Sequence, residues 1–437
     1  MAPQDSPAGL PPGEELHNFA HSIFPICRSL TGNGVRQTLG LIRQVLPQLT
    51  IHEVPSGTPA FDWTVPDEWN IRSAFIEDSS GRRIVDFAAH NLHVVGYSMP
   101  VNTTISLGEL QTHLHSLPHK PDVIPYVTSY YQKSWGFCLP HKLRESLKPD
   151  DYRVVIDSDL QAGSLTYGEL IIPGHSRDEI LLSTYVCHPS MANNEISGPV
   201  IATYLARWLS MAPRHYTYRI IFVPETIGAI VYLSRHLSHL KKYVTAGYVL
   251  TCCGDEGKFS YLPSRTGQTY ADKIALRVLS EHAPGFTHYS FLQRGSDERQ
   301  YCSPLVDLPV ASVMRSKYHE YTEYHSSADD LKFVTAKGLA TSLNLYVEIV
   351  RTLEANRVLR ATLAGEPQLG KRDLYPNTGG QVDQSAVNAV IDLLAFADGQ
   401  SDIVDIAAAT KHDVSHLRML TETLIKHGLL TTGFSCS

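Results

Sequence analysis

The sequence predicts an α/β protein: a mostly parallel mixed sheet flanked by helices, with an inserted mainly-β domain and a small C-terminal winged-helix-like domain. Three observations predict this fold class. Short apolar runs alternate with helical patterns from about residue 151 onward, which is typical of a parallel sheet covered on both faces. The stretch 61–140 is rich in Trp, Tyr, Val and Thr between turn residues, and the chain from 376 onward shows three short helical patterns.

The chain length sets the number of domains that we expect. A chain of 437 residues is longer than one ordinary hydrophobic core accommodates. We expect a discontinuous catalytic domain of residues 1–60 and 141–375, an inserted β-rich domain of residues 61–140 and a winged-helix-like domain of residues 376–437.

The individual elements follow in order along the chain. Residues 14–46 have helical periodicity with a break at 31–34, and WNIRSAFIED, RRIVDFA and LHVVGYSM are strand-like runs bounded by turn residues. The expected strands that follow cover residues 153–160, 168–174, 178–187, 218–224, 246–254 and 309–314. The expected helices cover residues 194–209, 228–243, 270–282 and 335–353.

The C-terminal segments SAVNAVIDLLAFADG, IVDIAAATK and VSHLRMLTETLIKHGLL indicate three short helices. Their order and length are those of a winged helix. Because the segment carries few Lys and Arg residues, we expect a packing or dimerisation element rather than a DNA-reading one.

Composition excludes several classes of protein. The formal net charge of -7 has no long runs of one sign, so a nucleic-acid partner is not expected. The N-terminus lacks the basic and apolar regions of a signal peptide, and no stretch approaches the roughly 18 apolar residues of a membrane span. We therefore expect a cytoplasmic protein. Seven cysteines without a C-x-x-C pair indicate neither a disulfide framework nor a zinc knuckle.

Candidate catalytic residues follow the predicted strands. Ligands of a parallel sheet bind beyond the carboxyl ends of its strands. His188 follows the strand 178–187, and Glu195 begins the next helix; Glu225 follows the strand 218–224. His is a common zinc ligand, and a carboxylate beside a metal can act as a general base. The alternative is that His188 is an ordinary loop histidine whose side chain caps the backbone, and that Glu195 and Glu225 only stabilise the starts of the helices that follow them.

Further polar residues follow the next strands. Asp255 comes after the strand 246–254 and could ligate metal or form a solvated turn. The segment RGSDERQY supplies Asp297, Arg299 and Tyr301, whose charges suit substrate binding. The last predicted strand is followed by YHEYTEYHSSADDL. It contains His325, a second candidate metal ligand, and Asp329, either a ligand or a helix cap. Four strand ends with such side chains indicate one open metal site.

With these residues in place, the chain resembles the zinc exopeptidases that include aminopeptidases, glutamate carboxypeptidases and glutaminyl cyclases. More narrowly, it is similar to a bacterial aminopeptidase-like subfamily with an inserted β domain and a winged-helix-like C-terminus. The resemblance rests on CRSLTGNGVRQTL, DEWNIRSAFI, VIPYVTSYYQKSWGFCLP, YVCHPSMANNEISGPV, FVPETIGAI, GSDERQY, YHSSADDL and GKRDLYP. It implies that His188 and His325 bind zinc and that Glu225 is the general base.

The sequence departs from that family where a second zinc would bind. The bridging Asp falls at Asn194, the second adjacent Glu at Thr226, and the later Asp ligand near Thr251. The resemblance therefore implies one zinc per chain, held by His188, Glu195 and His325. Asn194, Asp255 and Asp329 are further candidates, either as additional ligands or as residues that orient the ligands.

The function implied is a zinc metallohydrolase, aminopeptidase-like, that cleaves a small peptide or amide substrate with metal-activated water and Glu225 as base. One alternative is an amidohydrolase or deacylase of a small metabolite in a biosynthetic pathway. Another is a degenerate hydrolase fold that serves as a binding or regulatory protein. A homo-oligomer is compatible with the extra domains.

Overall fold

A mixed sheet of eight strands lies at the centre of the first of two compact units. The computed structural model describes residues 9–372, 374 and 384–434. The first unit takes in the residues up to Ala271 together with Thr287–Asn344, and the second takes in Asp272–Phe286 with the residues from Leu345 onward. The predicted domain boundary between residues 375 and 376 lies outside the described residues.

The order of the sheet is β1-β10-β12-β11-β13-β16-β14-β15. These strands are β1 (Thr50–Pro55), β10 (Ser164–Ile172), β11 (Glu179–Tyr185), β12 (Thr217–Val223), β13 (Val244–Val249), β14 (Ser260–Leu262), β15 (Thr287–His288) and β16 (Val310–Met314). The central strands β12, β11, β13 and β16 are parallel. β1 and β10 run antiparallel to their neighbours, and β14 is antiparallel to β16 but parallel to β15. Every residue of β11 is buried, as expected of a strand covered on both faces.

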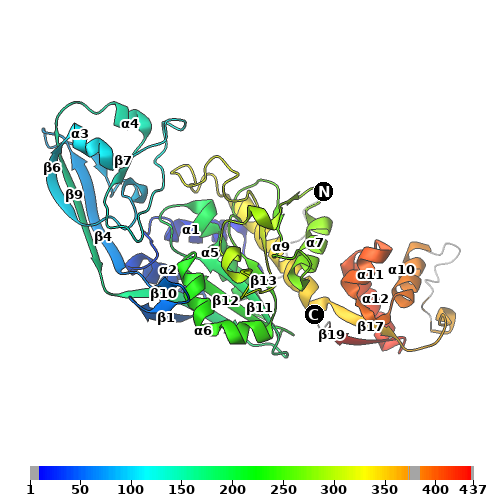
Figure 1. Cartoon of the computed structure of the whole chain (residues 1–437). Helices are drawn as coiled ribbons and strands as arrows, with labels where there is room; N and C mark the ends of the chain where they lie inside the picture. The colour runs from blue at the N-terminus through cyan, green and yellow to red at the C-terminus, as the bar shows by residue number, and fades with distance from the viewer. Residues whose placement is uncertain (1–8, 373, 375–383, 435–437) are drawn as a thin grey trace. The chain divides into compact units, whose positions relative to one another are not determined.

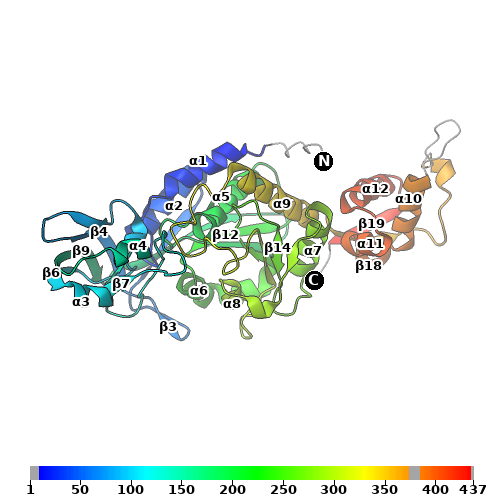
Figure 2. The same cartoon turned by 90° about the horizontal axis from the view of Figure 1, so that it is seen from above.

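Helices cover both faces of the sheet, so the predicted α/β class with a large flanked sheet is confirmed (Figures 1 and 2). α1 (Gly13–Ile23) and α5 (Ser197–Leu209) lie on one face, and α6 (Ile227–Tyr243) lies on the other. The remaining helices up to residue 355 are α2 (Asn33–Val45), α3 (Leu107–Leu110), α4 (His141–Glu145), α7 (Tyr270–His282), α8 (Glu298–Tyr301) and α9 (Ala336–Ala355). None of the described helices has the length and apolarity needed to cross a membrane.

A second, antiparallel sheet has the order β5-β4-β9-β6. Its strands are β4 (Glu68–Glu77), β5 (Arg83–Asp86), β6 (Val101–Ser106) and β9 (Asp151–Gln161). Two short pairs accompany it: β2 (Pro59–Ala60) with β3 (Trp63–Thr64), and β7 (Leu114–His115) with β8 (Phe137–Cys138). Residues 153–160 are expected in the main alternating series, yet they lie here in β9. The alternating burial of β9 explains this placement, since it is typical of a strand with one buried face.

A carboxylate on β4 joins the second sheet to helix α2. Arg36 Nη1 and Nη2 donate to Glu68 Oε1 and Oε2 at 2.8 and 2.6 Å, and the backbone N–H of Ser164 donates to Oε2 at 3.0 Å. Chiefly because of the hydrogen bonds from Arg36, the pKa of Glu68 falls to about 2. The stability that this carboxylate contributes is therefore present above its ordinary pKa of 4.5 and is lost as pH falls towards 2.

Glu68→Gln is expected to lower the free energy of unfolding by about 1–2 kcal/mol near neutral pH, because a charged double hydrogen bond becomes a neutral one. The deficit should shrink near pH ~3.5, because the carboxylate of the unfolded chain, with its ordinary pKa of 4.5, is largely protonated there, whereas the folded one, with a pKa of about 2, still carries its charge. Urea unfolding of wild type and variant, near neutral pH and near pH ~3.5, measures the difference in the free energy of unfolding. Glu53→Gln is the control, since that carboxylate also accepts from Arg36 but is 53% exposed. An equal deficit at both pH values would contradict this role of Glu68.

The C-terminal part of the second unit, in the described residues between 357 and 434, contains a three-stranded antiparallel sheet, β18-β17-β19, and three α-helices. Its elements are β17 (Arg357–Ala361), α10 (Gln384–Ala395), β18 (Asp398–Asp402), α11 (Ile403–Thr410), α12 (Val414–Lys426) and β19 (Leu430–Phe434). The three helices coincide with the three helical patterns of the sequence. The strand β17 has no counterpart among the predicted elements, because its short polar sequence RVLRA lacks the apolar run of a buried strand.

Candidate metal and catalytic site

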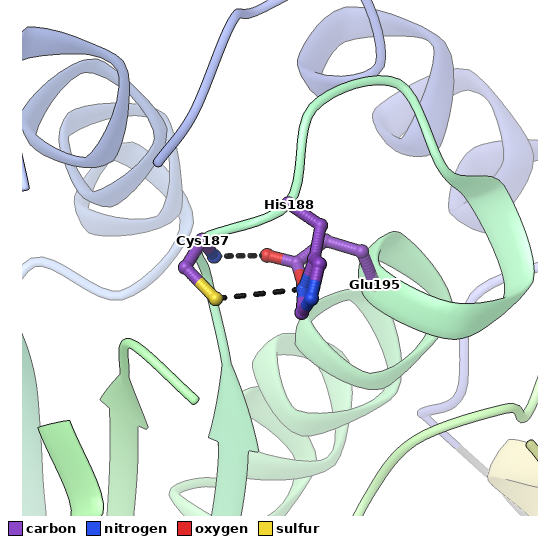
Figure 3. Close-up of side chains that lie close together, drawn as sticks. All are labelled: Cys187, His188 and Glu195. Atoms are coloured by element: carbon purple, nitrogen blue, oxygen red, sulfur yellow. Dashed lines mark hydrogen bonds and ion pairs between the residues drawn. The ribbon is translucent and has the colours of Figure 1, made fainter. Parts of the chain in front are cut away.

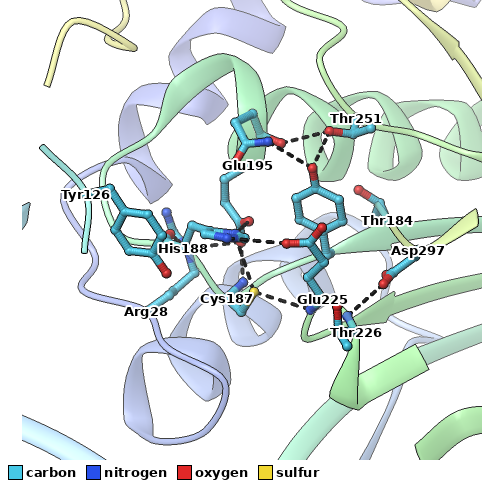
Figure 4. Close-up of polar contacts among 12 residues, drawn as sticks. Arg28, Tyr126, Thr184, Cys187, His188, Glu195, Glu225, Thr226, Thr251 and Asp297 are labelled. Carbon is cyan, nitrogen blue, oxygen red and sulfur yellow. Dashed lines mark hydrogen bonds and ion pairs between the residues drawn. The ribbon is translucent and has the colours of Figure 1, made fainter. Parts of the chain in front are cut away.

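The structure brings together three predicted site residues beyond the carboxyl ends of parallel strands. β11 and β12 are parallel neighbours that end at Tyr185 and Val223, so His188 and Glu225 reach the same edge of the sheet. His188 Nε2 lies 3.4 Å from Glu225 Oε2, and the rings of His188 and His325 have centroids 5.7 Å apart. Figure 4 shows the imidazole of His188 pointing to the Glu225 carboxylate.

Glu195 lies on the opposite side of the His188 ring. It belongs to a buried π-helical turn, Ala192–Ile196, that precedes α5. Its Oε2 is 2.6 Å from His188 Nδ1, and its Oε1 accepts a hydrogen bond from the backbone N–H of Cys187 (Figure 3). Two ligands of one tetrahedral zinc stand about 3.3 Å apart when each bond is near 2.0 Å. The shorter distance is that of a hydrogen bond, so Glu195 here fixes the orientation of the imidazole.

A buried arginine that sequence reasoning missed balances the charge of Glu195. Arg28 Nε donates to the carbonyl of His188 at 3.1 Å and lies 3.8 Å from Glu195 Oε1, with both side chains 1% exposed. Its Nη1 donates to the carbonyl of Ile23 at 2.7 Å. The segment CRSLTGNG, which contributes to the family resemblance, was the available signal.

Tyr126 is a second site residue that sequence reasoning missed. Its ring lies edge-on to His188 and to His325, with centroid distances of 5.2 and 5.1 Å. The backbone N–H of Tyr126 donates to the carbonyl of His325 at 2.9 Å, and Pro125 forms a bridge with Ser326. The stretch predicted as a β-rich insertion thus holds the loop that carries the second histidine.

The surroundings shift the pKa values of the two histidines in opposite directions. Burial and the nearby His188 lower the pKa of His325 to about 2, so its imidazole is neutral. Among the described residues, neither ring nitrogen of His325 has a hydrogen-bond partner, and the ring stacks on Tyr324 at 3.8 Å. Burial lowers the pKa of His188, but Glu195 outweighs it and the net shift is upward. Burial also raises the pKa of Glu225, against His188 and Arg299.

The further candidates make hydrogen bonds to the protein next to this site; they are Asn194, Asp255 and Asp329. Asp329 accepts from the backbone N–H groups of Asn193 and Asn194 at 2.6 and 3.0 Å, which caps the turn that carries Glu195. Asp255 accepts from the side chains of Asn193 and Ser316 at 2.9 and 2.8 Å. The Asn194 amide donates to a tyrosine hydroxyl at 3.0 Å. The carboxylates of Asp255 and Asp329 therefore both accept hydrogen bonds from groups of the protein itself.

Of the three predicted substrate-binding residues, only Arg299 is exposed. Asp297 is fully buried, and its Oδ1 accepts the backbone N–H of Thr226 at 2.7 Å. Tyr301 is also fully buried, and its hydroxyl bonds to Ser183 Oγ at 2.7 Å. Arg299 donates to Thr226 Oγ1 at 3.1 Å, beside Glu225.

Strained backbone surrounds the site. Ser190, Thr226 and His325 have φ values of 42°, 62° and 52°, although none of them is glycine. Such conformations cost on the order of 1–3 kcal/mol each and persist where function fixes them. Each of these residues lies at or within two residues of His188, Glu225 or His325. Some of the strained positions in the described chain therefore lie at the candidate site.

The residues present fit a zinc ion. His188 and His325 offer two imidazoles, a ligand type that zinc accepts, and the ring nitrogens of His325 have no protein partner among the described residues. A carboxylate on the second nitrogen of a metal-binding histidine fixes its tautomer and orientation. Glu195 stands in this position relative to His188.

The fold is an α/β fold similar to that of aminopeptidases. A zinc aminopeptidase from Bacillus subtilis superposes with a TM-score of 0.55 at 14% identity, over 78% of this chain and 95% of that chain. A family described as a domain of unknown function, DUF4910, matches residues 17–356, and the chain belongs to it. A winged helix-turn-helix family matches residues 357–432, which confirms the predicted winged helix.

Relatives from Clostridium acetobutylicum cover nearly the whole chain. One, named "Putative polysaccharide biosynthesis protein with aminopeptidase-like domain", is 45% identical over 420 residues, which is 96% of each chain. A crystal structure titled "putative peptidase" has a TM-score of 0.91 at 43% identity and covers 96% of each chain. That structure therefore matches this chain along nearly its whole length.

Proposed function

We propose that this protein is a zinc-dependent hydrolase of an amide or peptide bond, with one zinc per chain. The observation that carries the proposal is the convergence of His188 Nε2, the unpartnered imidazole of His325 and the Glu225 carboxylate at one edge of a parallel sheet. The likeness of the fold to zinc aminopeptidases supports the same chemistry.

Each residue has a distinct task in the proposed reaction. When bound, zinc lowers the pKa of a water molecule to roughly 7 and polarises the substrate carbonyl. Glu225, 20% exposed, accepts the proton of the attacking water and passes it to the departing nitrogen. The water oxygen joins the carbonyl carbon, the C–N bond breaks, and a carboxylic acid and an amine are released.

Glu195 has a different role in this proposal from the ligand role that the family resemblance implies. Its oxygens accept from His188 Nδ1 and Cys187 N, so we assign it the orientation of His188. His188, through Nε2, which faces Glu225, and His325 would hold the zinc.

Two substrate classes are compatible with this chemistry. The first is the N-terminal residue of a peptide. The second is an amide of a small metabolite, and the naming of a relative for polysaccharide biosynthesis favours it. Arg299, exposed beside Thr226, is the residue that we assign to an anionic group of either substrate.

Removal of metal is the test of this function. A chelator should abolish hydrolysis by the purified protein, and one equivalent of zinc should restore it, measured on aminoacyl anilides, dipeptides and N-acylated metabolites. Hydrolysis that survives complete metal removal would contradict the proposal. So would a protein that binds zinc weakly and cleaves none of these substrates, as the degenerate-fold alternative requires.

A further inference from the structure

A pocket of about 210 Å³ opens beside the candidate catalytic residue. Glu225 and Ile227 line it on one side, and Trp63, Tyr130 and Tyr131 line it on the other. The aromatic residues come from the region of the second sheet, whereas Glu225 follows β12 of the main sheet. The pocket therefore lies where the two sheets of the first unit meet.

Two of these aromatic side chains are unusually open to solvent. Trp63 is 40% exposed and Tyr131 is 52% exposed, and their rings lie 5.9 Å apart at 62°. Buried aromatic rings would contribute to the stability of the core. An exposed pair at the mouth of a pocket with a catalytic carboxylate instead provides apolar faces for a ligand.

The backbone holds these rings in place at an energetic cost. Trp63 lies on the hairpin β2–β3, and Tyr130, in the same pocket wall, has φ 43°. Bulky residues are rarely found at positive φ, and strain of this kind marks functional sites. The Tyr130 hydroxyl is 2.9 Å from that of Tyr126, the residue between the two histidines. The aromatic wall is thus tied to the proposed metal ligands.

The pocket lacks the feature that recognises a peptide amino terminus. A free ammonium group needs an exposed carboxylate besides the general base, but Glu225 is the one acid among the residues that line this pocket. Asp297, close by, is fully buried and bonded to Thr226 N. On the far side of Tyr130 and Tyr131, a hollow of about 140 Å³ is lined by polar side chains that include the exposed Asp67, Gln132 and Lys133.

These features match the chemistry of a sugar ring. A pyranose has a face of C–H groups that packs on aromatic rings, and hydroxyl groups at its edge that need polar partners. We propose that Trp63 and Tyr131 form a subsite for the pyranose ring of an N-acylated amino sugar, whose amide faces Glu225. This assignment rests on the proposed hydrolase function and names its substrate class.

Calorimetric binding of a sugar probe tests the subsite without any turnover. The probe is the methyl glycoside of N-acetylglucosamine, titrated into the full-length Glu225→Gln protein. Trp63→Ala should raise the Kd about tenfold or more, because a stacked aromatic face is lost. Trp63→Phe retains a face and should stay within about threefold. Phe61→Ala, on the same hairpin but outside the pocket lining, should change the Kd less than about twofold.

The outcomes separate the subsite from the hydrolase proposal. Saturable binding that depends on Trp63 supports the subsite even if the zinc-loaded wild type cleaves no amide, in which case the hydrolase proposal fails. Glu225-dependent hydrolysis of leucine anilide without any binding of the sugar overturns the subsite and leaves the hydrolase proposal standing. Sugar binding that Trp63→Ala and Phe61→Ala weaken equally also overturns the subsite.

Discussion

Glu225→Gln is expected to lower kcat by about 100-fold or more, within the usual range for loss of a general base. Glutamine preserves the size and the hydrogen-bonding oxygen of the side chain but cannot take a proton from water. The zinc content should stay at one per chain, because His188 and His325 are unchanged. Steady-state rates and metal analysis on the same sample measure both quantities.

The zinc content also distinguishes two roles that the geometry allows. At 3.4 Å from His188 Nε2, the Glu225 carboxylate is close enough to share the metal and also close enough to act on a water beside it. Retained zinc with lost turnover supports the base, whereas loss of zinc identifies Glu225 as a ligand. Glu256→Gln is the matched control, since this exposed carboxylate follows the neighbouring strand β13 and pairs with Lys337. It should change kcat less than about twofold.

Arg28→Met is expected to lower the free energy of unfolding by about 3–5 kcal/mol, because it leaves the carboxylate of Glu195 buried without its cation. Both side chains are 1% exposed, so water cannot replace the lost partner. The variant also loses the hydrogen bonds to the carbonyls of His188 and Ile23. Methionine fills the space of the arginine stem and separates the charge effect from a packing effect. Urea unfolding measures the difference.

A double-mutant cycle with Glu195→Gln provides the control for the charge pair. If the Arg28 deficit comes from the unpaired carboxylate, the double variant should recover a part of the stability lost in Arg28→Met, with an interaction energy of about 1–3 kcal/mol. Strictly additive losses would show that Arg28 acts through its backbone contacts alone.

Sequence reasoning could predict that the candidate residues His188 and Glu225 lie together, because that prediction rests on topology. Parallel strands end at the same edge of a sheet, so residues that directly follow β11 and β12 must lie close together. The alternation of strands and helices is strong enough to predict both strands. The fold class follows from the same alternation.

The details of the site depended on contacts that no local pattern contains. Glu195 faces Nδ1 of His188 because its turn is π-helical and capped by Asp329, and neither feature has a periodic signature. Arg28 and Tyr126 reach His188 across long sequence separations. Strand β9 joined the second sheet because β4 and β6 pair with it on both sides, a choice of partner that its own residues do not specify.

Anomalous X-ray scattering at the zinc edge, from crystals of the zinc-loaded protein, tests the central claim most directly. We predict one zinc per chain, bound to Nε2 of His188 and to His325, with Glu195 still accepting a hydrogen bond from Nδ1 of His188. Two zinc ions per chain, a zinc bound between Nδ1 and Glu195, or no peak at the two histidines would contradict it.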